Sequence, residues 1–115
     1  MRGTEGWAGF DGRHIAVVGW GAEEKFRLST HGMLDGGKKY HADGFQLEGK
    51  AVLDVPPDEF AKVARGLVGV YRIPMELEAD NGTTVSVAAL VTNAGGEPLR
   101  RGLGIRFTSD IYEVK

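Results

Sequence analysis

Two alternating segments joined by the turn Asp80-Asn81-Gly82 constrain the fold more than any other feature of the sequence. Apolar and polar residues alternate from Val70 to Ala79, and again from Thr83 to Thr92. A period of two is typical of a strand with one buried face, and an Asn-Gly pair favours a tight hairpin turn. The pattern therefore predicts an antiparallel hairpin. Its inward residues are Tyr71, Ile73, Met75, Leu77 and Ala79, then Val85, Val87, Ala89 and Val91.

Further strands are expected on both sides of this hairpin. Gly19-Trp20-Gly21 is interpreted as a turn between the first two, and Gly49 as a β-bulge in the third. Apolar β-branched runs and alternation place these strands at His14–Trp20, Lys25–Ser29, Phe45–Val55, Leu103–Thr108 and, as a continuation or closing edge, Asp110–Val114.

One helix is predicted after Pro56 and Pro57, which suit a helix entry but not a central strand. Its apolar positions are Phe60, Val63, Ala64 and Leu67, at the spacing of one helical face, and Gly66 or Gly69 ends it. About ten residues are too few for a helix that stands alone in water, so it must lie on a sheet.

These elements predict a mainly β fold, an antiparallel β-sandwich or small barrel with one short α-helix. The chain has 115 residues, enough for one domain spanning residues 1–115 that buries roughly two thirds of its unfolded surface.

Glycine is in excess, with 18 residues, about twice the ordinary usage of roughly 7%. The glycines gather in three places, which we interpret as an N-terminal arm at residues 1–12, a long Gly-rich loop at residues 30–44 and a loop at Asn93–Pro98. Loops as long as the second usually have a function or a partner.

Composition excludes several classes of protein. The chain has no cysteine, which rules out disulfides, zinc ribbons, iron–sulfur centres and thiol nucleophiles. Its net charge of −2 counts against a dedicated nucleic-acid binder. Neither a signal peptide nor an apolar run of 18 residues is present, so we expect no membrane partner.

No catalytic set rises above chance. His31, Asp35, His41 and Asp43 share the long loop without the spacing of a metal site. Ser29 lacks the surroundings of an activated nucleophile. We therefore expect no enzyme, no catalytic residue, no metal and no cofactor, and look instead to surfaces where chains meet.

Candidates for contacts between subunits come from the arms. Trp7 and Phe10 in the N-terminal arm must either fold back over the core or dock on another subunit. Basic and aromatic residues in the loops are further candidates for such contacts: Lys38, Lys39, Tyr40, His41, Arg100 and Arg101.

The run from Arg72 to Phe107 (RIPMELEADNGTTVSVAALVTNAGGEPLRRGLGIRF) resembles the closing portion of the tail tube proteins of contractile-tailed phages. The rest of the chain is similar to that family in length and element order, including a GF-x-L-EGKA-type strand before the helix. The resemblance implies a β-sandwich whose copies form hexameric rings, stacked into a tube around a tape-measure protein, with the long loop and termini touching the next ring.

Several roles follow from this resemblance. Glu76 and Glu78 would line the channel, where negative charge lets DNA pass without specific binding. The partners would be copies of the chain, the sheath and the tape-measure protein, and the location the virion, after synthesis in the host cytoplasm. Other small virion proteins remain alternatives: a tail terminator, a head–tail adaptor or a capsid decoration protein.

A second resemblance is to PilZ domains, small β-barrels that bind cyclic di-GMP. Gly102-Leu103-Gly104-Ile105-Arg106-Phe107 is similar to their closing strand, and Arg27-Leu28-Ser29-Thr30-His31-Gly32 to their Asp/Asn-x-Ser-x-x-Gly motif. Arg27 replaces the acidic or amide residue, and no Arg-x-x-x-Arg precedes the first strand. This alternative is a regulatory or binding domain without cyclic-di-GMP binding.

Overall fold

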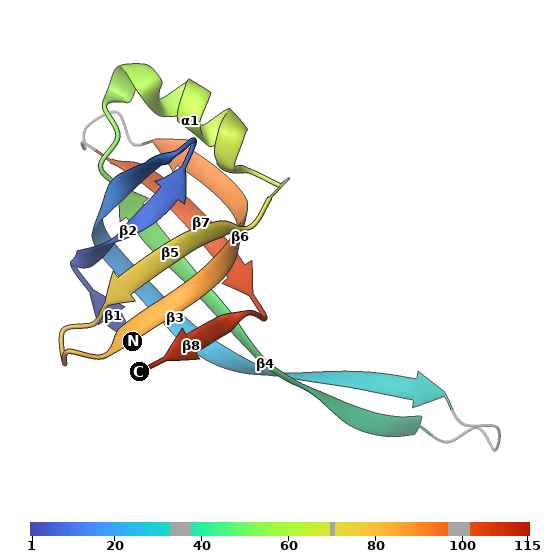
Figure 1. The fold of residues 1–115 in the computed structure, drawn as a ribbon. Coiled ribbons are helices and arrows are strands. Elements are labelled where there is room, and N and C mark those ends of the chain that lie inside the picture. Colours follow the sequence, from blue (N-terminus) through green and yellow to red (C-terminus); the bar gives the residue numbers. More distant parts are fainter. Residues whose placement is uncertain (33–37, 70, 97–101) are drawn as a thin grey trace.

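The chain folds into a closed antiparallel barrel of six strands, shown in Figure 1. The computed structural model describes residues 1–32, 38–69, 71–96 and 102–115. The barrel strands are β2 (Glu5–Phe10), β3 (Arg13–Gly32), β4 (Lys38–Leu53), β5 (Ile73–Glu78), β6 (Thr84–Gly96) and β7 (Leu103–Ser109). Two short strands, β1 (Arg2–Gly3) and β8 (Tyr112–Val114), pair with β3 and β6.

The barrel closes because β3 and β4 pair with each other as well as with their other neighbours. Around the barrel the order is β3-β2-β5-β6-β7-β4, and the β3–β4 ladder returns to the start. A sandwich would leave two separate sheets with open edges, so of the two architectures expected from the sequence the barrel is the one that forms.

The alternating apolar residues of β5 and β6 lie in the core, as the sequence predicts. Met75 and Leu77 of β5 are buried, as are Val85, Val87, Ala89 and Val91 of β6, and the residues that alternate with them are more exposed. The turn at Asp80–Gly82 is present, and Gly82 has a φ of +87°, which favours glycine. Tyr71, predicted to point inward, is 74% exposed because β5 begins only at Ile73.

The predicted helix is confirmed. A 3₁₀ turn, η1 (Pro57–Glu59), leads into α1 (Phe60–Leu67), which lies across one end of the barrel. Val63 and Leu67 are fully buried, and Phe60 and Ala64 pack against the core from its edge. The helix therefore closes the barrel end with the face that its spacing predicted.

The two N-terminal strands predicted at His14–Trp20 and Lys25–Ser29 are one continuous strand, β3. Gly19-Trp20-Gly21 is not a turn, because these residues pair with β1 and β4. The glycines instead lie beside a register shift between Val17 and Gly19. A glycine that allows a bulge or a close approach has the same local signature as one in a turn.

The interpretation of residues 30–44 as a loop is also wrong for residues 30–32 and 38–44. Thr30 to Gly32 pair with Tyr40 to Lys38, and the pairing continues into the barrel. We call the part of this hairpin beyond Phe26 and Phe45 the ribbon; it projects away from the barrel in Figure 1. The ribbon continues the β3–β4 ladder of the barrel with a register shift between Arg27 and Leu28, and local composition does not reveal this long-range pairing. Residues 33–37 lie outside the described residues.

The N-terminal segment is not a free arm either. β2 fills the position between β3 and β5, where Trp7 lies opposite Ala16 and Glu76. Likewise, Asn93–Gly96 continues β6 rather than forming a loop; residues 97 and 98 are outside the described part. In both cases a long-range strand partner overrides glycine-rich local sequence.

Gly49 does not mark a bulge, since β4 keeps its register there with both neighbours. It marks a close approach instead. A Cβ atom at this position would lie 2.5 Å from the Gly21 carbonyl oxygen and 2.8 Å from the Phe107 ring. Only a residue without a side chain fits between these strands.

We expect Gly49→Ala to lower the free energy of unfolding by about 1–3 kcal/mol, the usual cost of overpacking a tight core. Thermal or urea unfolding followed by circular dichroism measures this. Gly95→Ala is the matched control, because a Cβ there meets nothing within 4 Å. Equal stability of the two variants would contradict the close approach at Gly49.

Candidate assembly surfaces

No catalytic or metal site is evident in the part of the chain that the structure describes. No group of three or more His, Asp or Glu side chains there is placed to hold a metal ion. None of the described helices has the length and apolar character needed to span a membrane. The search for function therefore turns to polar clusters and to the outer surface.

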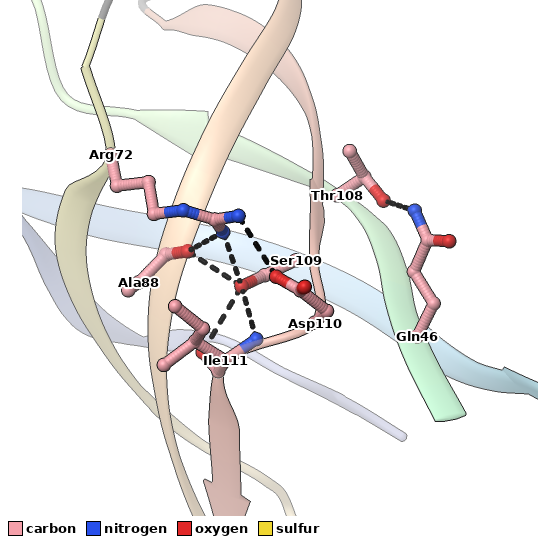
Figure 2. Close-up of polar contacts among 7 residues, drawn as sticks. All are labelled: Gln46, Arg72, Ala88, Thr108, Ser109, Asp110 and Ile111. Carbon is pink, nitrogen blue, oxygen red and sulfur yellow. Dashed lines mark hydrogen bonds and ion pairs between the residues drawn. The ribbon is translucent and has the colours of Figure 1, made fainter. Parts of the chain in front are cut away.

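The densest polar cluster surrounds Ser109 at the corner between β7 and β8, shown in Figure 2. The Ser109 hydroxyl is 2% exposed. It donates to the Ala88 carbonyl oxygen at 2.6 Å and accepts from the Ile111 backbone N–H at 2.9 Å. Arg72 also donates to this hydroxyl at 3.2 Å and to Asp110 at 2.8 Å.

This cluster stabilises the corner of the chain after β7 and does not activate the Ser109 hydroxyl as a nucleophile. A nucleophilic serine needs a neighbouring base that can take its proton, and here the neighbours are backbone groups and a guanidinium that is always charged. The hydroxyl instead replaces the backbone hydrogen bonds that the chain loses as it leaves β7. β8 is thereby directed along β6 and away from β4.

Carboxylates gather on the outer surface formed by β2, β5 and β8. Register places Glu5 directly opposite Glu78, and Ser86 between Glu76 and Glu113. All four glutamates are exposed. We call this surface the acidic face.

The other side of the barrel carries a basic pair. Lys50 of β4 lies directly opposite Arg106 of β7, and both are exposed. They border an open hollow that is also lined by Lys25, Glu23 and Glu48. Lys25 and Glu48 form an ion pair at 2.9 Å, and that hydrogen-bonded contact raises the pKa of Lys25 above its ordinary value. We call the surface around Lys50 and Arg106 the basic face.

Glu76 and Glu78, expected in a channel wall, point outward from β5, and Glu76 accepts a hydrogen bond from Ser86 at 3.2 Å. Trp7, expected at a contact between subunits, is half-buried on the same face, directly opposite Glu76. Its ring stacks on His14 with centroids 3.8 Å apart. The structure therefore places Trp7 on the same face as Glu76 and Glu78, although the sequence predicts different roles for them.

The remaining contact candidates are distributed differently. Phe10 packs within the chain, against the core and close to Gly66 of α1. The backbone of Lys38, Lys39, Tyr40 and His41 forms the β4 side of the ribbon, while their side chains are outside the described part. Arg100 and Arg101 also lie outside it.

Sequence reasoning missed Glu5, Glu113, Lys50 and Arg106 as members of charged surfaces. Each occupies an outward position of its strand, which alternation alone could have suggested. Their grouping depends on register between strands far apart in the sequence, for example residue 5 with residue 78. Single-strand patterns carry no information on that register.

The base of the ribbon exposes an aromatic pair. Phe26 and Phe45 lie opposite one another with ring centroids 5.1 Å apart, and they are 52% and 55% exposed. Nearby, the Tyr112 hydroxyl donates to Glu24 at 3.1 Å. Desolvation, followed by this hydrogen bond, raises the pKa of Tyr112 above its ordinary value. The contact joins β8 to the point where β3 leaves the barrel.

The residues of the PilZ resemblance do not form one described pocket. Arg27–Gly32 lies along the β3 side of the ribbon, and Gly102–Phe107 leads into β7. Side chains 27–32 are outside the described part, so this alternative stays a prediction.

Comparison with known proteins adds one finding about shape. The chain has the fold of a solved structure described as the anti-feeding prophage cap, the AFP tube terminating cap. The match has a TM-score of 0.53 at 12% identity and covers 97% of this chain and 88% of that one. No family model and no curated protein matches the sequence. At this identity the likeness establishes the fold alone.

We expect Ser109→Ala to lower the free energy of unfolding by about 1–3 kcal/mol, because the Ala88 and Ile111 backbone groups lose a buried partner. Chemical denaturation measures the change. Ser86→Ala is the matched control, since its hydroxyl bonds only to the exposed Glu76. A loss of equal size in both variants would contradict a structural role for the Ser109 cluster.

Proposed function

We propose that this protein is a structural subunit of a phage-tail-like particle and that its copies assemble into rings on the axis of a tail tube. It acts by contact with other chains and not by catalysis. Its place is then in the virion or particle, with copies of itself as the first partners. The tape-measure protein, the sheath and a passing DNA are further proposed neighbours.

The observation that carries this proposal is the ribbon. Two strands leave the barrel together, and on the described part of the chain neither has a second strand partner beyond Gly44 and Arg27. An isolated two-stranded hairpin is marginally stable in water, and unpaired strand edges readily accept another chain. The half-exposed Phe26 and Phe45 at its base add apolar surface that a contact would cover.

Two independent likenesses support the same class of protein. The sequence resembles tail tube proteins from Arg72 to Phe107, and the fold matches a structure described as a tube terminating cap over almost the whole chain. Both are proteins of a tail tube. A ring is the form that a tube subunit and a terminator would share.

Assembly of the purified protein tests the proposal and distinguishes a tube subunit from a tube terminator. Sedimentation velocity and electron microscopy over increasing concentration are expected to show rings. Long stacks of rings support a tube subunit, and rings of one fixed height support a terminator. A monomer at every concentration would count against both.

We expect shortening of the ribbon to separate folding from assembly. Replacing residues 28–43 by Asn-Gly joins Arg27 to Gly44 through a two-residue hairpin turn and keeps the Phe26–Phe45 pair. The barrel should unfold within a few degrees of the parent protein, because the residues removed pair only with each other in the described part of the chain. Assembly should be lost in sedimentation experiments.

Two outcomes would contradict the prediction for the shortened ribbon. A shortened chain that assembles like the parent would show that the ribbon makes no contact between copies. A shortened chain that fails to fold, by circular dichroism, would show that the ribbon belongs to the folding unit and not to an assembly surface.

A further inference from the structure

Two pairs of like charges without an ion-pair partner face each other across neighbouring strands on the outside of the barrel. A third like pair, Glu23 opposite Glu48, is joined to Lys25 by the Lys25–Glu48 ion pair. Glu5 of β2 lies opposite Glu78 of β5, and Lys50 of β4 lies opposite Arg106 of β7. Side chains in such positions are close neighbours, and like charges there destabilise the sheet. Among the residues that the structure describes, none of the four is in an ion pair.

The two pairs cannot neutralise each other within one copy. In the order β3-β2-β5-β6-β7-β4, the β2–β5 and β7–β4 pairs are separated by β6 on one side and β3 on the other. They therefore lie on opposite sides of a closed barrel, and in Figure 1 β5 crosses in front of β4. Charge brought by another chain can relieve the repulsion in each pair.

We propose that the acidic face of one copy docks on the basic face of the next, with Glu5 and Glu78 against Lys50 and Arg106. The proposal rests on the proposed function and names two surfaces that, together with the ribbon, hold its ring together. A contact between two different faces repeats from copy to copy, and it gives a ring where the repeated rotation closes.

Each face also carries an apolar neighbour of its charged pair. Trp7 lies two residues from Glu5 on the same side of β2, and Val52, 39% exposed, lies two residues from Lys50 on the same side of β4. Exposed ion pairs by themselves contribute little affinity. The charges therefore select the partner face and its orientation, and the apolar groups and a half-buried tryptophan supply binding.

This placement differs from the expectation that Glu76 and Glu78 line a channel. Glu76 lies opposite Trp7 on the paired strands, and Glu78 lies opposite Glu5. A contact made through Trp7 and Glu5 would therefore cover Glu76 and Glu78 as well. A channel wall is the alternative position of the acidic face, and the experiment below distinguishes the two.

Charge exchange between the faces tests the proposal. One variant carries Glu5→Lys and Glu78→Lys, a second carries Lys50→Glu and Arg106→Glu, and a third carries all four changes. Like charges remain opposite each other in every variant, so the sheet keeps the same cross-strand repulsion. Circular dichroism confirms folding, and sedimentation velocity at low salt measures association.

Each double variant alone is expected to associate at least tenfold more weakly than the parent, because the two cross-strand pairs that would face each other then carry the same charge. An equal mixture of the two should associate again, as rings of alternating copies. The four-fold variant should assemble by itself, since the charges of its two cross-strand pairs are exchanged and again complementary. Added salt should weaken association of the parent and of the four-fold variant alike.

The control variant carries Asp54→Lys and Asp58→Lys, the same change in net charge as the first double variant, at exposed positions before and within η1. It should assemble like the parent. Assembly by both double variants at the parent's strength overturns the inference and favours the channel wall, while the proposed function stands. Failure of both the mixture and the four-fold variant to assemble also overturns it. A parent protein that never forms rings overturns the proposed function itself.

Discussion

The antiparallel ladder between β3 and β4 is the interaction on which the rest of the structure depends. It runs from Val17 and Leu53 inside the barrel to Gly32 and Lys38 at the far end of the ribbon. Within the barrel this ladder joins the two ends of the strand order and closes the core. Beyond Phe26 and Phe45 the same hydrogen bonds continue without support from other described strands. The same ladder therefore belongs both to the closed barrel and to the ribbon.

Closure of the barrel also decides what its surface can do. A closed sheet has one buried and one exposed side, so every second residue of each strand faces outward. Strands that are distant around the barrel then present separate surfaces, and here one is acidic and the other basic. The corner at Ser109 contributes by directing β8 along β6, which adds Glu113 to the acidic face. Architecture and charge together make a subunit with two different faces and a projection.

Much of the fold could be predicted from the sequence. The β5–β6 hairpin, its buried residues and the helix with Val63 and Leu67 inside follow from alternation, turn chemistry and helical spacing. The errors share one cause. The sequence indicates a turn at Gly19, a bulge at Gly49 and a loop at Gly32 and Gly44, whereas all four lie in paired strands. Glycine relaxes a local constraint, and whether that freedom serves a turn or a close approach depends on strands elsewhere in the chain.

The sequence by itself determined the fold class, the single helix and which positions of most strands face the core, because these depend on periodicity within ten or so residues. It also identified Trp7, Glu76 and Glu78 as surface candidates. Only the tertiary structure decided that the barrel closes, that residues 30–32 and 38–44 are paired strands, and that Glu5 meets Glu78 while Lys50 meets Arg106. Register between distant strands is fixed by the packing of the whole core, which no local pattern records.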